Sequence, residues 1–388
     1  MKKALVFPLC YKEKLSESRV KIYEVKKMVD LDLLKKLTEI PAPSGHEDQM
    51  ISFVKKYMLK YADTVEVDNI GNVIGMLKGT SEKAPRIMIS AHMDEIGLII
   101  RRVEKEGFLR FERLGGVEPK SLFAREVQIL ARNGIVEGVI GIKAHHLAAY
   151  QKELEEIKDM YIDIGADNKE EVNKLGIRIG DPVVFKPNMK ILNGKYIISK
   201  AMDNRAQLSV LLETLRTLYH QRPKATIYFV ATVLEEFNVR GALPAAYKIS
   251  PKLAICLDIA VATDTPDLKG LGADVRLGKG AALQLFSFHG RGTLGGLIPP
   301  PKLVEHIERI AKEKDIPYQR STFFGGLSEA SFMPVLKEGI PAVDIGIPCR
   351  YTHSPAEMVA ISDIDAVRRL LIEFINSVDE GMEITRGD

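Results

Sequence analysis

Apolar residues along this chain form short uninterrupted runs and longer stretches in which they recur every three or four positions. The runs are typical of strands buried on both faces; they lie at residues 87–90, 227–234, 253–257 and 343–347. The periodic stretches predict helices over residues 206–218, 304–312 and 364–375. Because strands that alternate with helices form sheets covered by helices, we predict an α/β fold with a mostly parallel sheet flanked by helices.

The stretch from residue 102 to residue 193 has a different pattern. Short β-like segments separated by turn signals lie at residues 108–111, 127–131, 136–142 and 181–185. We therefore predict an inserted all-β domain at residues 102–193, within a larger α/β domain formed by residues 28–101 and 194–388.

The N-terminal part of the chain gives two further predictions. Residues 1–27 carry many charges and little periodic pattern, so they are expected to form an extension, and the sequence leaves open whether translation starts at Met1 or Met28. Further on, Ser44 and Glu47 have the spacing of a capping box, which predicts a helix that starts at this point.

The composition excludes several classes of protein. With 388 residues, of which 46% are hydrophobic, the chain can form a large core. The net charge of +3 indicates neither a nucleic-acid partner nor a membrane surface. No apolar stretch approaches the ~18 residues that a membrane span needs. Three scattered cysteines, Cys10, Cys256 and Cys349, exclude a disulfide framework and favour a reducing cytoplasm.

Residues that bind metal ions well stand after the predicted strands. They are His92 with Asp94, the pair Glu235 and Glu236, Asp258, and His353. Asp203 stands just before the helix predicted at residues 206–218. Because ligands gather outside the carboxyl ends of parallel strands, we expect these side chains to meet. Each one alone is more often a packed or solvated residue, but so many strand-end placements are hard to explain as separate accidents.

This set of residues suits the hydrolysis of an amide by two metals. Two divalent ions about 3.5–4 Å apart provide a nucleophilic water and stabilise charge on the carbonyl oxygen. They need a carboxylate that bridges them, and Asp203 suits this role. His92 and Asp258 could complete one metal site, and Glu236 and His353 the other.

The two remaining acidic residues have separate expected roles. Asp94 lies two residues after His92 on a strand, so the two share a face and the carboxylate can orient the imidazole ring. Glu235 and Glu236 point to opposite sides of a strand end. One can therefore bind metal while the other, Glu235, acts as the general base that carries a proton from water to the leaving amine.

The segments that carry these residues resemble the tetrahedral (TET) aminopeptidases, which are dinuclear metallopeptidases. The segments are Ala91-His92-Met93-Asp94-Glu95-Ile96-Gly97, Lys200-Ala201-Met202-Asp203-Asn204-Arg205, Val233-Leu234-Glu235-Glu236 and Arg350-Tyr351-Thr352-His353-Ser354-Pro355. The resemblance extends over about residues 28–380. It implies a zinc-peptidase-like fold, two zinc or cobalt ions in the sites described above, and oligopeptide substrates. It also implies a homo-oligomer, a tetrahedral dodecamer, built partly through the inserted domain.

Three positions depart from the usual family pattern. Asn204 replaces a second aspartate, and Ile259-Ala260-Val261 stands where a Thr-His pair is common. The segment Gly325-Gly326-Leu327-Ser328 replaces Gly-Gly-Thr-Asp, a region near the substrate pocket in the family. Gly326 and Ser328 are therefore candidate substrate-binding residues, and the preferred N-terminal residue is left open.

Two alternatives to an aminopeptidase remain. A related two-metal amidohydrolase, either a deacylase or a dipeptidase, would use the same ligand types and would differ in whether a free amino terminus is required. An inactive self-assembling scaffold would keep the fold, but the intact set of site residues argues against it. The ligand types do not separate zinc from cobalt, and assembly size rests on the resemblance alone.

Overall fold

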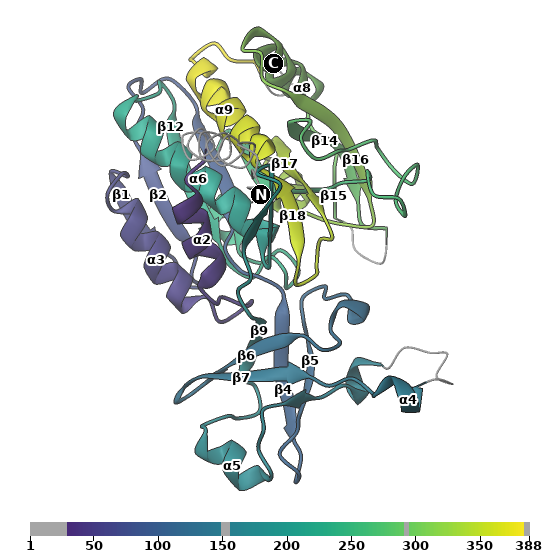
Figure 1. Ribbon diagram of the computed structural model, residues 1–388. Helices are drawn as coiled ribbons and strands as arrows, with labels where there is room; N and C mark the ends of the chain where they lie inside the picture. The colour runs from purple at the N-terminus through teal and green to yellow at the C-terminus, as the bar shows by residue number, and fades with distance from the viewer. Residues whose placement is uncertain (1–28, 149–155, 291–294, 384–388) are drawn as a thin grey trace, which may run out of the picture.

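The computed structural model describes residues 29–148, 156–290 and 295–383. The N-terminal extension expected at residues 1–27 lies outside these ranges. A large sheet covered by helices forms one part of the molecule, and a smaller β-barrel projects from it (Figure 1). Within the described residues, no helix has both the length and the apolar character that crossing a membrane requires.

The large sheet has 12 strands, and its centre is parallel. The central strands are, in spatial order, β12 (Thr226–Thr232), β3 (Arg86–His92), β13 (Leu253–Val261) and β17 (Ala342–Arg350). Antiparallel strands extend the sheet on both sides; they are β1 (Thr64–Val67), β2 (Val73–Leu77), β10 (Lys190–Leu192), β11 (Tyr196–Ser199), β14 (Ala281–Phe288), β15 (Gly296–Leu297) and β18 (Glu357–Ala360). The last strand, β16 (Tyr318–Phe324), runs parallel to β14. The α/β prediction is confirmed, and the parallel pairs that it emphasised lie mainly at the centre.

Helices pack on both faces of this sheet. One face carries α2 (Leu31–Glu39), α3 (Asp48–Met58), α6 (Met202–His220), α8 (Pro301–Glu313) and α9 (Ile361–Ser377). The other carries α7 (Ala242–Ile249) and the 3-10 helix η3 (Glu329–Val335). Since side chains alternate along a strand, Ile87 and Ile89 of β3 enter the first core and Met88 enters the second. The three helices predicted from periodicity lie within α6, α8 and α9.

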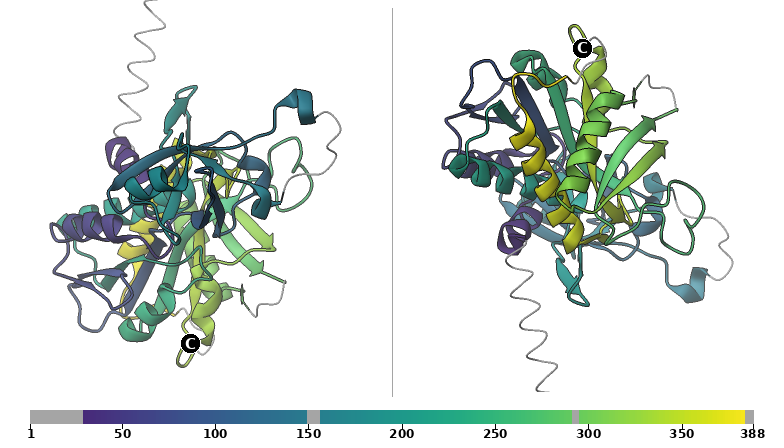
Figure 2. Two further views of the ribbon diagram at one scale, coloured as in Figure 1. Left: turned by 90° about the horizontal axis from the view of Figure 1, so that it is seen from below. Right: turned by 90° about the horizontal axis from the view of Figure 1, so that it is seen from above.

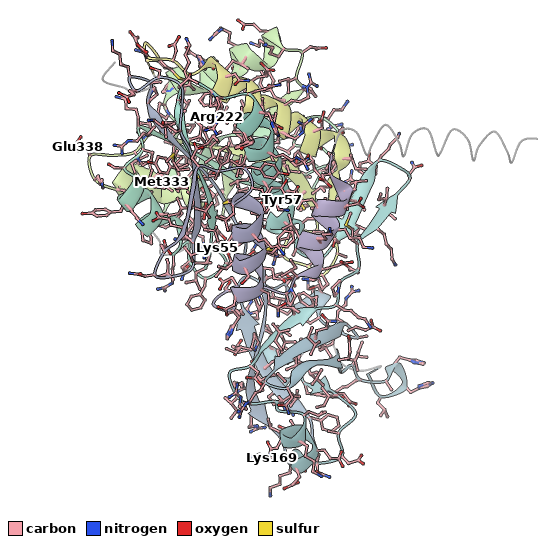
Figure 3. The ribbon with its side chains drawn as sticks, turned by 90° about the vertical axis from the view of Figure 1, so that its left-hand side faces the viewer. Lys55, Tyr57, Lys169, Arg222, Met333 and Glu338 are labelled. Carbon is pink, nitrogen blue, oxygen red and sulfur yellow. The ribbon has the colours of Figure 1, made fainter. Side chains whose placement is uncertain are left out.

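The barrel closes in the order β4-β5-β8-β7-β6-β9 and has its own apolar core. Its strands are β4 (Gly97–Val103), β5 (Leu109–Leu114), β6 (Glu126–Ala131), β7 (Gly134–Ile140), β8 (Ile162–Asp163) and β9 (Pro182–Phe185). Short helical segments connect them; these are η1 (Pro119–Ser121), α4 (His145–Ala148), η2 (Ile157–Asp159) and α5 (Lys169–Lys174). Lys169 lies at the end of the barrel that is far from the sheet, whereas Lys55 and Tyr57 belong to the α/β part (Figure 3). The left view of Figure 2 looks from the barrel side.

The strands place the barrel slightly differently from the predicted range of 102–193. That range begins inside β4, whose start at Gly97 belongs to the barrel, and it includes β10, which pairs with β11 of the large sheet. A short apolar run predicts a strand but does not contain information about which sheet the strand joins. Only the pairing partners determine that.

The capping box predicted from Ser44 and Glu47 is wrong. Helix α3 begins at Asp48, and its N-cap residue Glu47 makes no side-chain cap hydrogen bond. The Ser44 hydroxyl instead donates to Asp94 Oδ2 at 2.6 Å. Glu47 Oε1 accepts from the backbone N–H of Gly45 at 2.9 Å and of Leu234 at 3.1 Å. Both side chains therefore stabilise distant segments, because buried tertiary partners compete with the local cap.

Candidate metal centre

The structure brings the predicted site residues together at the carboxyl edge of the parallel strands. His92 is the last residue of β3, and Glu235 and Glu236 follow β12 after Thr232. His353 lies just beyond β17, which ends at Arg350. The position of Asp258 differs from the prediction, because β13 does not end at residue 257 but continues to Val261, and Asp258 lies within it. Its partner across the sheet is Gly346 of β17.

Two groups of side chains share Asp203. The potential ligand atoms of His92, Asp203 and Asp258 lie within 4.8 Å of one another, and so do those of Asp203, Glu236 and His353. His92 Nε2 is 3.1 Å from Asp203 Oδ1, whereas His353 Nε2 is 3.6 Å from Asp203 Oδ2. The two oxygens of this carboxylate therefore face different histidines, which is the arrangement that a bridging ligand needs.

The backbone around Asp203 is held by a buried carboxylate that the sequence analysis missed. Glu357, the first residue of β18, accepts from the backbone N–H of Asp203 at 2.9 Å and of His353 at 2.8 Å. The peptide between Asp203 and Asn204 is cis, and the Asn204 side chain donates to the Leu257 carbonyl at 2.7 Å. Glu357 follows His353 by four residues and directly precedes the apolar Met358-Val359-Ala360, which was the available signal.

Asp94 joins the two strand ends that carry His92 and the glutamate pair. Its Oδ1 lies 3.3 Å from His92 Nδ1, within ion-pair distance. The same carboxylate accepts from the backbone N–H groups of Glu235 and Glu236, each at 3.0 Å. Asp94 thus lies within ion-pair distance of the imidazole ring and holds the turn that presents the two glutamates.

Glu235 lies beside the histidine and borders the cavity. Its Oε2 is 3.8 Å from His92 Nε2, and its side chain is 10% exposed. The preceding residue, Leu234, has a φ of 57°, a left-handed conformation that turns the chain sharply at the strand end. The two glutamates consequently differ in surroundings, since Glu236 Oε2 is 3.7 Å from His353 Nε2.

The site concentrates negative charge. Burial raises the pKa of Glu235 and of Asp258 well above the usual range, and it raises the pKa of Glu236 to about 7. Burial acts in the same direction on Asp203, but hydrogen bonds from His353 and His92 lower the pKa of this carboxyl. Ionised carboxylates of this kind are costly to bury unless cations compensate them. Imidazole and carboxylate ligands fit divalent ions such as zinc, so these residues fit a metal site.

A cavity of about 600 Å³ adjoins these residues. It extends from the metal-binding groups over β13, β14 and β17 to the segment that contains Gly326 and Ser328. Both predicted substrate-binding residues therefore line it. Ser328 Oγ donates to Asp344 Oδ2 at 2.5 Å, and Asp344, which the sequence analysis did not single out, also lines the cavity.

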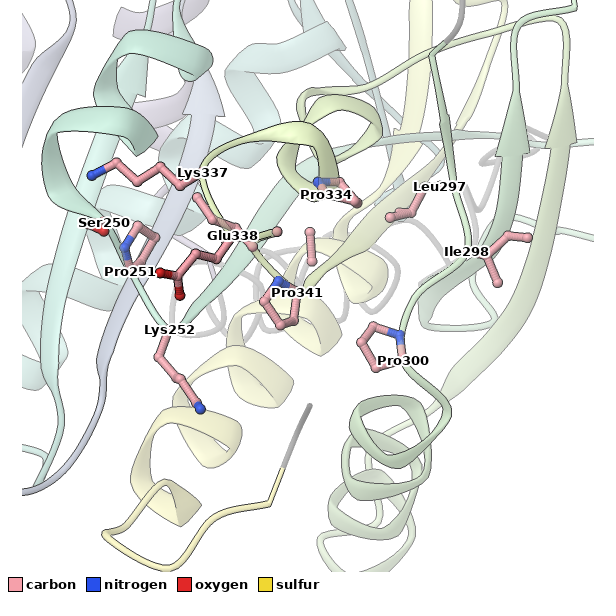
Figure 4. A pocket seen from close by; sticks show the side chains of 13 residues that line it. Ser250, Pro251, Lys252, Leu297, Ile298, Pro300, Pro334, Lys337, Glu338 and Pro341 are labelled. Atoms are coloured by element: carbon pink, nitrogen blue, oxygen red, sulfur yellow. The ribbon is translucent and has the colours of Figure 1, made fainter. Parts of the chain in front are cut away.

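A second hollow lies at the opposite end of β17 and lacks this chemistry. Figure 4 shows it between Lys252, Lys337, Glu338 and several prolines. Its described lining contains no histidine, and Glu338 is its one carboxylate side chain. Because ligands of parallel sheets bind at the carboxyl ends of the strands, this position is also the less suitable one.

Comparison with known proteins agrees with this geometry. Residues 71–370 match the family described as M42 glutamyl aminopeptidase. The lysyl aminopeptidase of Pyrococcus furiosus is 33% identical over 364 residues, which cover 91% of this chain and 99% of that one. The solved aminopeptidase APDkam598 from the archaeon Desulfurococcus kamchatkensis has a TM-score of 0.86 and 39% identity, covering 92% of this chain and 96% of its own.

A second solved structure is the TET1 peptidase of Pyrococcus horikoshii. It has a TM-score of 0.79 and 31% identity, and the match covers 90% of this chain and 99% of that one. That peptidase can assemble into a tetrahedron or a large octahedral shell. On the match to the family model and the near full-length relatives, the chain belongs to the M42 glutamyl aminopeptidase family of metal-dependent peptide hydrolases.

Proposed function

We propose that the chain removes N-terminal residues from oligopeptides with the help of two divalent ions, zinc or cobalt. His92, Asp203 and Asp258 would hold one ion, and Asp203, Glu236 and His353 would hold the other. The observation that carries this proposal is the position of Asp203, whose two carboxylate oxygens face His92 and His353.

The reaction adds the oxygen of a water molecule to the scissile carbonyl carbon and breaks the peptide C–N bond. The bound ions would lower the pKa of a water and polarise the carbonyl oxygen. Glu235 would accept one proton from the attacking water and deliver it to the leaving nitrogen, which departs as an amine. Its position beside His92 and its partial exposure to the cavity support this role.

The remaining residues would act by positioning. Asp94 would hold the His92 ring in place and fix the turn before Glu235 and Glu236. Glu357 would position the bridging Asp203 and His353 through their backbone N–H groups. Gly326 and Ser328 would contact the substrate, since they line the cavity next to the metal-binding groups.

The proposal extends to the assembly and its location. Several apolar residues of the barrel domain are exposed; they are Ile135, Val139, Ile142, Leu147 and Ile179. Such residues support a contact between copies of the chain, and the TET1 relative forms shells. We infer a homo-oligomer, with a tetrahedral dodecamer as the expected form, in the cytoplasm. A mass near twelve chains by light scattering would support this form, and a stable monomer would contradict it.

The test of function compares aminoacyl-p-nitroanilide hydrolysis by wild-type protein and Glu235→Gln after loading with zinc or cobalt. We expect the substitution to lower kcat roughly 10²- to 10⁴-fold, while about two ions per chain remain bound because Glu235 is not among the proposed ligands. Glu338→Gln is the matched control, since this exposed glutamate lies at the second hollow.

Two outcomes would overturn the proposal. Full activity of Glu235→Gln, or hydrolysis that persists after complete removal of metal, would refute the mechanism. Equal cleavage of substrates with free and acetylated amino termini would instead favour the alternative of a deacylase or a related amidohydrolase.

A further inference from the structure

One end of the cavity, beside the proposed metal centre, carries a buried carboxylate with an unused oxygen. Asp344 is 4% exposed, and its Oδ2 accepts from Ser328 Oγ. Its Oδ1 has no hydrogen-bond partner among the described residues. Asp344 is one of the residues that line the cavity, so a molecule in the cavity is the available partner for this oxygen.

The strand register places Asp344 at a defined distance from the metal-binding groups. Asp344 pairs with Cys256 of β13, and the next pair on the same face, two residues along, is Gly346 with Asp258. One interstrand spacing combined with two residues along the strand gives a backbone separation on the order of 8 Å between Asp344 and Asp258. Gly346 places no side chain between them. This separation suits the side chain of a substrate residue whose peptide bond lies at the metal centre.

Two further residues that line the cavity have polar atoms without hydrogen-bond partners among the described residues. Ser287 is 4% exposed, and its Oγ has no hydrogen-bond partner among the described residues; the same holds for His289 Nδ1. Both residues line the cavity together with Asp344 and Gln284, which is the partner of Asp344 across β14 and β17. A hydroxyl, an imidazole nitrogen and a carboxylate can all accept hydrogen bonds.

The charge balance favours a cationic ligand. The residues described as lining the cavity include neither Lys nor Arg. Burial raises the pKa of Asp344 to about 7, which reflects the cost of keeping this carboxylate ionised in the absence of a counter-ion. A ligand that brings a positive charge and several N–H donors would remove that cost, whereas an acidic ligand would increase it.

We propose that Asp344, Ser287 and His289 form the pocket for the substrate's N-terminal side chain, and that this pocket selects lysine and arginine. The inference rests on the proposed aminopeptidase function and specifies its substrate class. Ser328 stands where the resembling family usually has an aspartate, and here it donates a hydrogen bond to Asp344. The carboxylate at this end of the cavity therefore comes from the neighbouring strand β17.

The experiment measures kcat/KM of the zinc- or cobalt-loaded protein for p-nitroanilides of lysine, arginine, norleucine, leucine and glutamate. Lysine and norleucine have side chains of similar length and differ in charge, so their ratio in the wild-type protein reports on the pocket without any variant. We expect lysine to exceed norleucine roughly 10- to 100-fold, the range for a hydrogen-bonded charge, and glutamate to be the poorest substrate.

The variants assign this preference to Asp344. Asp344→Asn and Asp344→Leu should lower the lysine-to-norleucine ratio at least about tenfold. The matched control is Asp363→Asn, because Asp363 is also fully buried but bonds to the backbone of Gly278 and Gly280, outside the cavity lining. This control should keep the wild-type ratio.

The outcomes separate the two proposals. A wild-type protein that cleaves leucine and norleucine substrates as well as lysine overturns the basic pocket and leaves the aminopeptidase function standing. An unchanged ratio in folded Asp344 variants overturns the assignment to Asp344. A metal-loaded protein that cleaves none of the five substrates overturns the aminopeptidase proposal, and the pocket with it.

Discussion

Two buried clusters of charged side chains contain the adjacent residues Asp94 and Glu95, and the clusters differ in how their charge is compensated. Asp94 faces the candidate metal centre, and its neighbour Glu95 faces away from it toward two cationic side chains. Glu95 Oε2 is 2.5 Å from Lys200 Nζ, and Oε1 is 3.3 Å from Arg205 Nη2. Lys200 and Arg205 flank Asp203 in the sequence.

The difference shows where the fold supplies its own counter-charge. Glu95, Lys200 and Arg205 are almost completely buried, and the Glu95 carboxylate compensates part of the positive charge of the two cationic side chains. The carboxylates of Glu235, Glu236 and Asp258 are also buried, but the positive groups around them are two histidines. The first cluster is a structural support for the segment of Asp203. The second is arranged for cations that come from outside the chain.

The largest expected effect comes from removing the carboxylate shared by both proposed metal sites. Asp203→Asn should reduce bound metal from about two ions per chain to fewer than one, as measured by elemental analysis. Loss of a residue outside the ligand shell already costs about 10- to 100-fold in activity, so we expect a loss of at least ~10³-fold here. The matched control is Asp32→Asn, an exposed position in α2. Retention of two ions in Asp203→Asn would contradict the bridging role.

A smaller but still large effect is expected from the cluster of Glu95, Lys200 and Arg205. Glu95→Gln leaves Lys200 and Arg205 buried without their carboxylate, so the free energy of unfolding should fall by about 3–5 kcal/mol in urea titrations. Glu66→Gln is the control; Glu66 pairs with Lys248 at the surface, with side chains 49% and 53% exposed. That change should cost less than ~1 kcal/mol. If added metal restored Glu95→Gln to wild-type stability, the two clusters would not be independent.

The smallest effect concerns a buried carboxylate that is bonded to backbone N–H groups and belongs neither to the proposed metal centre nor to the Glu95 cluster. Asp363 accepts from the backbone N–H of Gly278 at 2.7 Å and of Gly280 at 2.8 Å. Burial raises its pKa from 3.8 to about 6. The native state therefore binds this proton more tightly than the unfolded state, and the resulting stability is complete below pH 3.8 and is lost as the pH rises through about 6.

The corresponding measurement compares unfolding of wild-type protein and Asp363→Asn between pH 4 and pH 7. The variant lacks the titrating group, so the loss of stability across this interval should be smaller than in the wild-type protein. Glu380→Gln changes an exposed residue near the end of the described chain. This variant should lose as much stability across the pH interval as the wild-type protein. Parallel pH profiles for wild-type protein and Asp363→Asn would contradict the raised pKa.

The elements that could be predicted from sequence are those with strong local patterns. The central strands and helices α6, α8 and α9 were predicted because apolar runs and helical spacing are properties of neighbouring residues. The errors have one common cause. The capping role expected for Ser44 and Glu47, the strand end expected before Asp258 and the start of the barrel at residue 102 all depended on partners far away in the sequence.

The candidate site shows the same division. Metal-binding residue types after apolar runs indicated which side chains would meet, and the described structure brings them together. Their roles as ligands and base stay predictions. Glu357 and Asp344 were not found from the sequence. A buried carboxylate that accepts hydrogen bonds from the backbone, or that has an oxygen without a partner among the described residues, has no distinctive sequence pattern.

The α/β class, the order of the central elements and the residues that could bind metal could be predicted from the amino-acid sequence, since periodicity and residue chemistry act locally. Which strands are neighbours depends on contacts between distant parts of the chain, and these place Asp203 between two histidines and Asp344 one strand over and two residues along from Asp258. The tertiary structure also decided which buried charges compensate each other, because electrostatic interaction depends on distance in space and on burial rather than on position in the chain.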